Sequence, residues 1–508
     1  MNENLFKQIQ IYELNTRIFC KDNACSLENF TESFFESSEY GASDCIWLMG
    51  IWKPSPSSLS IARTHRGLQM DYEKILPDYT ESDVIGSPYS IYEYTPNPLI
   101  AENFSEIKKF KKRLEEDGKK LILDFVPNHM AVDSTYIDAH PDLFLEKTSG
   151  EVCHNSFRHN NGRIYFYGRD PYFDGWTDTI QWDFSKEGVR KFHTEILLNL
   201  AEICHGVRCD MAMLPCGEVF QKTHGKIGLD YWKPLIEEIK SKFSQFLFIG
   251  EVYWNMEYQL QQSGFDYTYD KVLYDRLKNR SGREIVLHLS ADKSYQEKSL
   301  RFLENHDEER AAHTFGGKSI HMMSLLNFLP GAILTYEGQS IGLTKKQPVQ
   351  LGRLPDENPQ AGYSFFYQRS NLRIMIRKKY SVKNSTAYFN CYEVENYDPT
   401  VSRVLYYYSE KNIGMAKVKI YNLEFLVYNP EEREISGWLT FDKITRDFLE
   451  NLFYDNIELE DIITDKIYRK SKREMIDSGI FVKLGPGEAH WFVVDSDLLK
   501  EIHALSMG

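Results

Sequence analysis

The chain has 508 residues, a length that predicts roughly three domains with ample apolar material for a buried core. Hydrophobic residues make up 42 % and charged residues 26 % of the sequence, the ordinary balance of a globular protein. The net charge is −14 and no basic stripe offsets it, which argues against a nucleic-acid partner.

The cysteine spacing and the length of the apolar runs bear on metal binding and on where in the cell the protein is expected. The eight cysteines are scattered without a repeated C-x-x-C spacing, so no zinc site is expected. No apolar run reaches about 18 residues, and the first residues lack the basic and apolar regions of a signal peptide. We therefore expect a cytoplasmic protein without a membrane contact.

Predicted strands and helices alternate along most of the chain. The helix at residues 103–118 is the clearest, because Asn103 and Glu106 form a capping-box-like pair ahead of an apolar face. Further helices are expected at residues 29–35, 187–204, 230–242, 319–328 and 363–378. Eight strands are expected, at residues 9–14, 45–51, 120–126, 206–212, 246–252, 265–269, 300–303 and 332–336. This alternation predicts an α/β fold, a closed (β/α)8 barrel with its functional residues at the C-terminal ends of the strands.

Three stretches depart from the alternation. Residues 52–102 contain six prolines and predict an irregular connection. Residues 131–185 are rich in His, Asn, Gly, Asp and aromatic residues, which predicts a subdomain inserted after the third strand. Residues 381–508 alternate apolar with polar positions between Gly, Pro and Asn, the pattern of an antiparallel β-sandwich domain. Residues 1–130 and 186–380 are assigned to the barrel.

Two predicted strands end in residues suited to acid–base and nucleophilic chemistry. In HGVRCDMAM, Arg208 and Asp210 lie two residues apart and point to one side of a strand. The arginine favours the ionised carboxylate, which can act as a nucleophile, although a buried Arg–Asp pair can also serve only to tie a strand end. Glu251 follows the apolar run FLFIG, where burial raises a carboxyl pKa as a general acid requires.

Two further strands end in similar polar groups. KLILDFVPNH carries Asp124, Asn128 and His129, and LRFLENHDEER carries His306 and Asp307. The four stretches, in this order and separated by helix-length gaps, resemble the four conserved regions of glycoside hydrolase family 13, the α-amylase family. Weaker matches lie at residues 86–94, 179–185 and 329–339, so the resemblance covers about the first three quarters of the chain.

The resemblance implies a catalytic role for three carboxyl groups. Asp210 matches the family nucleophile, Glu251 the acid/base, and Asp307 the third carboxylate, which holds hydroxyls of the distorted sugar. Together they imply retaining hydrolysis of α-glucosidic bonds through a covalent glycosyl-enzyme. The inserted subdomain would wall the substrate cleft.

Substrate-binding roles are implied for a second set of residues. His129 and His306 match the two histidines that hydrogen-bond the sugar, and Asp124 matches the residue that orients Arg208. Tyr89 lies where the family places a tyrosine that stacks on the sugar. A loop tyrosine that only packs on the barrel rim explains Tyr89 equally well.

Departures from the family pattern bear on specificity and on calcium. Met213 and Leu214 replace a Lys-His pair that many α-amylases use on the acceptor side and near a structural calcium. Asn128 remains as a possible calcium ligand, but the sequence does not support the rest of that site, and no metal or cofactor is assigned. Arg310, three residues after Asp307, resembles the α-glucosidase and oligo-1,6-glucosidase branch, where it lies near the bound sugar.

The sequence thus predicts a hydrolase whose substrate is a short α-glucoside oligosaccharide. Two alternatives stay open. One is an α-glucosyl transferase or isomerase that uses a sugar acceptor, since the same intermediate serves both reactions. The other is a catalytically silent sugar-binding relative. Linkage preference and oligomeric state are not predicted.

Overall fold

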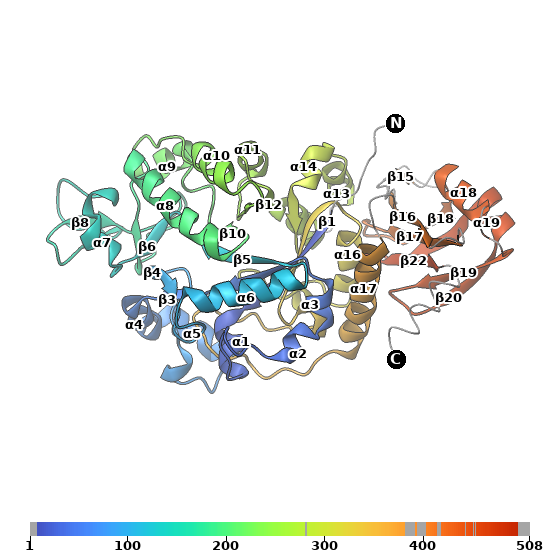
Figure 1. Ribbon diagram of the computed structural model, residues 1–508, viewed down its shortest axis with the longest axis horizontal. Helices are drawn as coiled ribbons and strands as arrows, with labels where there is room; N and C mark the ends of the chain where they lie inside the picture. Colours follow the sequence, from blue (N-terminus) through green and yellow to red (C-terminus); the bar gives the residue numbers. More distant parts are fainter. Residues whose placement is uncertain are drawn as a thin grey trace.

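Eight parallel strands close into a barrel in the computed structural model (Figure 1). The structure describes residues 8–279, 282–380, 392–393, 403–413, 418–441, 443–450, 452 and 454–495. The barrel strands are β1 (Gln8–Asn15), β2 (Cys45–Met49), β5 (Lys120–Phe125), β10 (Gly206–Cys209), β11 (Leu247–Gly250), β12 (Tyr267–Tyr269), β13 (Ser299–Arg301) and β14 (Gly331–Tyr336). Each overlaps one of the eight predicted strands, so the (β/α)8 prediction is confirmed.

Helices cover the outside of the barrel, and α6 (Phe104–Glu116) shows why they form. Its apolar residues Ile107, Phe110 and Leu114 are buried, and the N-cap Asn103 accepts a hydrogen bond from the backbone N–H of Ser105 at 2.9 Å. Apart from the helices of the proline-rich connection and the inserted subdomain, described below, the helices between barrel strands are α1 (Thr16–Asp22), α2 (Glu32–Phe35), α3 (Ser38–Ala42), α8 (Glu187–Ile203), α9 (Gly217–His224), α10 (Trp232–Lys242), α11 (Glu257–Gln262), α12 (Lys271–Asn279), α13 (Gly282–Leu289), α14 (Lys293–Glu297), α15 (Ala311–Thr314) and α16 (Lys318–Leu326). After β14 follow η3 (Gln339–Ile341) and α17 (Ala361–Tyr380).

Two predictions for the first third of the chain were wrong. Residues 29–35 do not form one helix, because the Asn29 side chain accepts a hydrogen bond from the N–H of Ser26 at 2.7 Å and holds a turn there. The proline-rich connection is also more regular than predicted. It contains α4 (Pro56–Thr64), α5 (Arg66–Ile75), η1 (Glu81–Asp83) and a β3–β4 pair (Trp52–Pro54 and Ile91–Pro96). Pro56 opens α4, where a missing N–H costs no helical hydrogen bond.

The predicted inserted subdomain lies between β5 and α8. It comprises β6 (His129–Ala131), α7 (Tyr136–Ala139), η2 (Pro141–Leu143), β7 (Ser156–Arg158), β8 (Ile164–Phe166) and β9 (Thr179–Gln181), with β6 paired to β9 and β7 to β8. The rings of Phe144 and Trp182 stack at 4.0 Å in its core. In Figure 1, α7 and β8 lie at the left end of the molecule, opposite the C-terminal strands.

The C-terminal part is an antiparallel β-domain, as predicted, but it also carries two helices. A six-stranded sheet has the order β15-β16-β17-β22-β19-β20, and β18 pairs with β21. Helices α18 and α19 complete the apolar core between the sheets. The bounds are β15 (Tyr392–Glu393), β16 (Arg403–Ile413), β17 (Val418–Tyr428), β18 (Ile435–Leu439), α18 (Lys443–Glu450), β19 (Asn456–Asp461), β20 (Ile467–Ser471), α19 (Lys472–Ser478), β21 (Ile480–Leu484) and β22 (Ala489–Asp495). Of the predicted domain, residues 381–391, 394–402, 414–417, 442, 451, 453 and 496–508 lie outside the described residues.

Candidate active site

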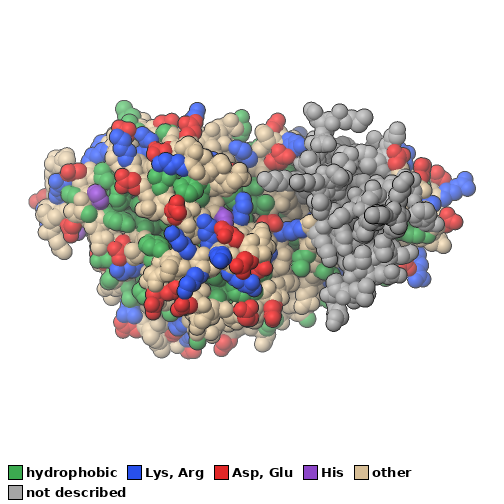
Figure 2. Space-filling view, viewed as in Figure 1, with side chains coloured by type: hydrophobic (Ala, Val, Ile, Leu, Met, Phe, Trp, Pro, Cys, Tyr) green, Lys and Arg blue, Asp and Glu red, His purple; other side chains and the backbone are tan. Residues whose placement is uncertain are grey.

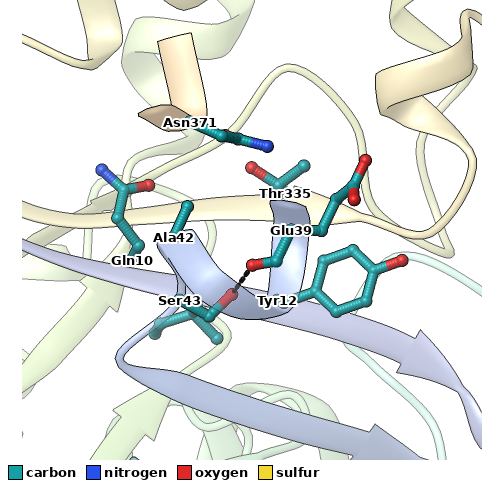
Figure 3. Close-up of a pocket in the computed structure, with 8 residues that line it drawn as sticks. Gln10, Tyr12, Glu39, Ala42, Ser43, Thr335 and Asn371 are labelled. Carbon is teal, nitrogen blue, oxygen red and sulfur yellow. Dashed lines mark hydrogen bonds between the residues drawn. The ribbon is translucent and has the colours of Figure 1, made fainter. Parts of the chain in front are cut away.

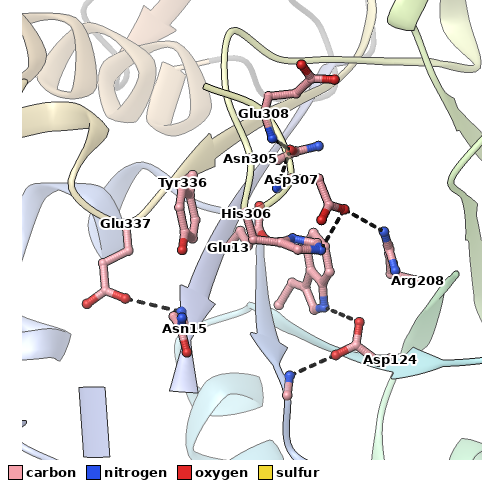
Figure 4. Close-up of polar contacts among 12 residues, drawn as sticks. Glu13, Asn15, Asp124, Arg208, Asn305, His306, Asp307, Glu308, Tyr336 and Glu337 are labelled. Carbon is pink, nitrogen blue, oxygen red and sulfur yellow. Dashed lines mark hydrogen bonds and ion pairs between the residues drawn. The ribbon is translucent and has the colours of Figure 1, made fainter. Parts of the chain in front are cut away.

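One buried arginine joins three carboxyl groups at the C-terminal end of the barrel. Arg208, fully buried on β10, places Nη1 2.8 Å from Oδ1 of Asp210 and Nη2 2.8 Å from Oε2 of Glu251. The same Nη2 lies 3.9 Å from Oδ2 of Asp307 (Figure 4). The Tyr269 hydroxyl accepts a hydrogen bond from Nε at 3.3 Å. The three carboxyl groups expected from separate strand ends therefore meet around a single guanidinium.

Glu251 is held by two hydrogen-bond donors and is only 3 % exposed. The Tyr253 hydroxyl donates to Oε1 at 2.8 Å, and the backbone N–H of Met211 donates to Oε2 at 2.7 Å. Burial raises the pKa of Glu251 to about 7, against the opposing effect of Arg208. A carboxyl group with a pKa near neutrality is suited to give a proton and take it back.

Asp210 depends on Arg208 for its charge. Burial raises the pKa of Asp210 above its ordinary value, and the arginine opposes this by stabilising the ionised form. The next residue, Met211, has a φ of 43°, a left-handed conformation that is uncommon outside glycine. The N–H of Met211 donates to Glu251, so the left-handed residue next to Asp210 links the two carboxyl groups.

Asp307 is the most exposed of the three carboxyl groups, with 44 % of its side chain accessible. Its Oδ2 lies 3.0 Å from Nε2 of His306, which is fully buried. Although burial acts to raise the pKa of Asp307, the His306 cation holds it well below the usual range. Nδ1 of His306 contacts Oε1 of Glu13, at the end of β1.

Asp124, which the resemblance matches to the residue that orients Arg208, lies opposite Arg208 on the neighbouring strand. Its carboxylate accepts hydrogen bonds from Trp47 Nε1 at 3.1 Å and from the N–H of Gly50 at 2.9 Å. β5 and β10 pair with Asp124 opposite Arg208, so the two residues act on each other through charge alone. Tyr269 and the carboxylates hold the guanidinium instead.

Tyr89 lies within the site. Its ring stacks on His306 with centroids 5.2 Å apart, and its hydroxyl lies 2.7 Å from His306 Nε2. The guanidinium carbon of Arg208 lies 5.2 Å from the centre of the same ring. His129 is buried beside Trp176, and burial lowers its pKa to about 4, so its imidazole is neutral at pH 7.

Arg310 lies behind the cleft rather than among the three carboxyl groups. It is 3 % exposed, pairs with Glu304 Oε1 at 2.7 Å and donates to the Glu337 carbonyl at 2.7 Å. The interpretation of Met213 and Leu214 as acceptor-facing residues is wrong. They are 0 % and 2 % exposed, because the turn after Asp210 folds them into the core.

Sequence reasoning missed several residues that shape the site: Glu13, Trp47, Tyr253 and Tyr269. Glu13 had a detectable signal, since an acidic residue interrupts the apolar run of a predicted barrel strand. The others had none, because tyrosine and tryptophan fit a buried strand end without any functional role.

Two cavities differ in their relation to the site. A cavity of about 530 Å³ is bounded by His306 and Asp307, by α5 and by the segment after η3, including Lys346 and Gln347. The second, of about 10 Å³, lies outside the barrel wall between β1, β14, α3 and α17 (Figure 3). Only the larger cavity can hold a sugar, since the smaller one has the size of about one water.

Metal-binding groups, membrane-spanning helices and charged patches are the other features of the described residues that would indicate a function. Among the described residues, no group of three or more His, Cys, Asp or Glu side chains is arranged to hold a metal ion. None of the described helices combines the length and apolarity needed to cross a bilayer. On the face shown in Figure 2, acidic and basic side chains are intermixed.

Comparison with curated proteins points to alpha-amylases. No family model matches the chain. It is 24 % identical to alpha-amylase MalA of Haloarcula japonica over 253 residues, 47 % of this chain and 34 % of that protein. It is 22 % identical to alpha-amylase 2 of Dictyoglomus thermophilum over 379 residues, 69 % of this chain and 63 % of that protein. The matches thus span less than two thirds of either relative.

Solved structures share the fold over nearly the whole chain. An alpha-amylase from Lactobacillus plantarum has a TM-score of 0.63 at 16 % identity, covering 96 % of this chain and 98 % of that one. A noncanonic maltogenic alpha-amylase from Thermotoga neapolitana has a TM-score of 0.62 at 20 % identity, covering 96 % and 99 %. A cyclic α-maltosyl-(1→6)-maltose hydrolase from Arthrobacter globiformis, in complex with maltose, has a TM-score of 0.58 at 11 % identity, and the match covers 95 % of this chain and 98 % of that one. The chain is therefore similar to alpha-amylases in fold over nearly its whole length and in sequence over part of it.

Proposed function

We propose that the protein is a retaining glycoside hydrolase of the α-amylase family that acts on α-glucosidic bonds of short oligosaccharides. The observation that carries the proposal is the contact of one buried guanidinium, Arg208, with Asp210, Glu251 and Asp307. A purely structural ion pair needs only one carboxylate. Burying a second and a third carboxylate beside the same arginine costs desolvation free energy and adds nothing to the stability of the fold. The similarity to alpha-amylases supports the same function.

The groups present can perform a double displacement. Protonated Glu251, with a pKa of about 7, gives its proton to the leaving oxygen while ionised Asp210 attacks the sugar carbon. The bond from carbon to the leaving oxygen breaks and a glycosyl ester forms on Asp210. Glu251, now ionised, then takes a proton from water, whose oxygen displaces Asp210 and retains the α configuration. Acid, base and nucleophile are all side chains, so the proposed reaction requires no cofactor.

The Asp307 carboxylate and His306 bind the sugar and take no part in breaking the glycosidic bond. Asp307 is ionised and partly exposed towards the large cavity, so it can accept hydrogen bonds from sugar hydroxyls. The cavity of about 530 Å³ falls in the range of roughly 300–1,000 Å³ that is common for small-ligand sites. This size supports an oligosaccharide substrate. The α-glucosidase-like branch remains part of the proposal as a sequence match, while Arg310 itself is buried against Glu304 and is not among the residues that line the large cavity.

Two observations bear on the remaining parts of the proposal. The seven cysteines among the described residues are free thiols, which supports operation in the reducing cytoplasm. A transferase that uses a sugar acceptor remains the alternative activity, because a second sugar can replace water at the glycosyl-enzyme. The silent relative is disfavoured, since all three carboxyl groups are present and joined.

The deciding experiment is a substrate panel with product analysis. Purified protein is incubated with maltose, isomaltose, sucrose, trehalose and soluble starch, with Asp210→Asn as the control for contaminating activity. We expect release of sugars that are in the α configuration when first observed by NMR. A β-configured first product would show inversion, and carboxyl groups well beyond about 5–5.5 Å apart in a complex would do the same. New oligosaccharides in place of free glucose would establish the transferase.

A further inference from the structure

Glu13 is a buried acid in the wall of the barrel that the proposed mechanism does not use. It is 0 % exposed, and its Oε2 has no hydrogen-bond partner. Its neighbour Tyr12 faces the outer cavity in Figure 3, whereas Glu13 points into the site in Figure 4, because consecutive strand residues face opposite sides. Burying a carboxylate is costly unless an opposite charge meets it.

The charge that meets Glu13 belongs to His306. Nδ1 of His306 contacts Oε1 of Glu13, and Nε2 lies 3.0 Å from Oδ2 of Asp307. A neutral imidazole carries one N–H and would turn a lone pair towards one of the two carboxylates. Only the protonated imidazolium ring can donate one N–H to Glu13 and another to Asp307. Glu13 and Asp307 together raise the pKa of His306 to about 10, against the opposing effect of burial.

Among the described residues, Glu13 and Asp307 place their carboxylates against the ring nitrogens of His306, whereas Asp124 acts on it only through charge at longer range. The Tyr89 hydroxyl lies 2.7 Å from Nε2, and Trp47 packs its ring edge against the imidazole at 5.5 Å. Arg208 contacts Asp307 from β10 and would repel a second cation, while Asp124 on β5 is held by Trp47 and Gly50. Glu13 is therefore the acid that offsets the positive charge on the side away from the substrate.

We propose that Glu13 is a positioning residue that keeps His306 charged and thereby keeps Asp307 ionised and oriented towards the sugar hydroxyls. This inference rests on the proposed function, because it assigns Asp307 to the sugar. The consequence is a relay in the order Glu13, His306, Asp307, in which the first residue never touches substrate.

The test is the pH dependence of Glu13→Gln, an isosteric change that removes the charge. Without Glu13 the His306 pKa falls, so its charge is kept at low pH and lost as the pH rises. We expect kcat/KM near the wild-type value at pH 5 and lower by on the order of tenfold at pH 7.5. The loss should fall mainly on KM for substrates that use their hydroxyls for binding.

Glu337→Gln is the matched control. Glu337 is a partly buried acid that directly follows β14, but it accepts a hydrogen bond from the N–H of Asn15 at 3.1 Å and lies away from His306 (Figure 4). Its variant should keep the wild-type pH profile. An equal loss for Glu13→Gln at every pH would mean a structural role and would overturn the proposal, as would an unchanged profile.

A second measurement does not depend on the variant folding or on activity. Imidazole nitrogen shifts of the native protein, with His306→Gln to assign the signal, should show His306 doubly protonated at pH 8. A neutral His306 at that pH overturns the proposal. If the wild-type protein cleaves none of the α-glucosides in the panel, the proposed function fails, while the same NMR measurement on Glu13→Gln, where His306 should be neutral at pH 8, still decides whether Glu13 holds the charge.

Discussion

At the scale of single residues, burial and hydrogen bonds set the protonation of Glu251. Burial raises its pKa to about 7, so the acid form persists to neutral pH instead of disappearing near the ordinary value of about 4.3. Two donors, Tyr253 and the Met211 N–H, fix the orientation of the carboxyl group. A hydrogen bond donated to a carboxylate favours its ionised form, so these donors moderate the rise that burial causes.

The first residue-scale prediction separates the acid from the nucleophile. Glu251→Gln should lose about 10²- to 10⁴-fold in turnover of substrates with poor leaving groups, because protonation of the leaving oxygen is lost. It should keep forming the glycosyl-enzyme from an α-glucosyl fluoride, whose leaving group needs no proton. Asp210→Asn should lose activity on both by about 10³-fold or more. Equal losses for Glu251→Gln on fluoride and oligosaccharide would exclude Glu251 as the acid.

A second residue-scale prediction concerns the alkaline limb of the pH profile. Glu251 must be protonated to act, so kcat/KM should fall as the pH rises through about 7. Tyr253→Phe removes a donor that favours the ionised form, which should move this limb to higher pH. Tyr258→Phe is the control, since Tyr258 is 56 % exposed on α11. A downward shift for Tyr253→Phe would contradict the assigned role of the hydroxyl.

At the scale of elements, the closure of the barrel between β13 and β14 depends on a glycine. Gly331 has a φ of +93°, and a Cβ there would lie 2.3 Å from the Ser299 carbonyl oxygen and 2.8 Å from that of Gln296. Both neighbours are backbone atoms, one on β13 and the other on helix α14, and cannot move aside as a flexible side chain could. A side chain at this position therefore has to push β14 away from β13.

The prediction at this scale compares two glycines with positive φ. Gly331→Ala should destabilise the protein by about 3 kcal/mol or more, because strain and a backbone clash combine. Gly118→Ala, with a φ of +70° and no atom within 4 Å of the added Cβ, should cost only about 1 kcal/mol. Urea denaturation of both variants measures the difference. An equal loss of unfolding free energy in the two variants would mean that β13 and β14 can move apart without cost, and would contradict the prediction.

At the scale of the whole molecule, the barrel sits between the inserted subdomain and the C-terminal domain (Figure 1). Helix α17 joins the barrel to the C-terminal sheet through Arg377, whose Nη2 lies 2.7 Å from the buried Glu424 carboxylate. The site lies at the barrel strand ends, and the large cavity opens beside it.

The whole-molecule prediction is a preference for short α-glucosides over internal cleavage of long glucans. It rests on the cavity of about 530 Å³, since Met213, Leu214 and Arg310 are all buried and do not support it. Incubation with soluble starch should release small sugars and new reducing ends while viscosity falls slowly. Asp210→Asn serves as the blank. A rapid fall in viscosity with few new reducing ends means internal attack and contradicts the prediction.

The sequence by itself determined the barrel and the C-terminal sheet, and it predicted the inserted subdomain and the three carboxyl residues of the site. These follow from local periodicity and from the polar residues that end apolar strands, such as Asp210 and Glu251. Only the tertiary structure decided that Arg208 joins all three acids, that Glu13 faces His306, and that Met213 is buried. Such contacts join residues up to 293 positions apart, so they depend on how the strands close and not on any local pattern.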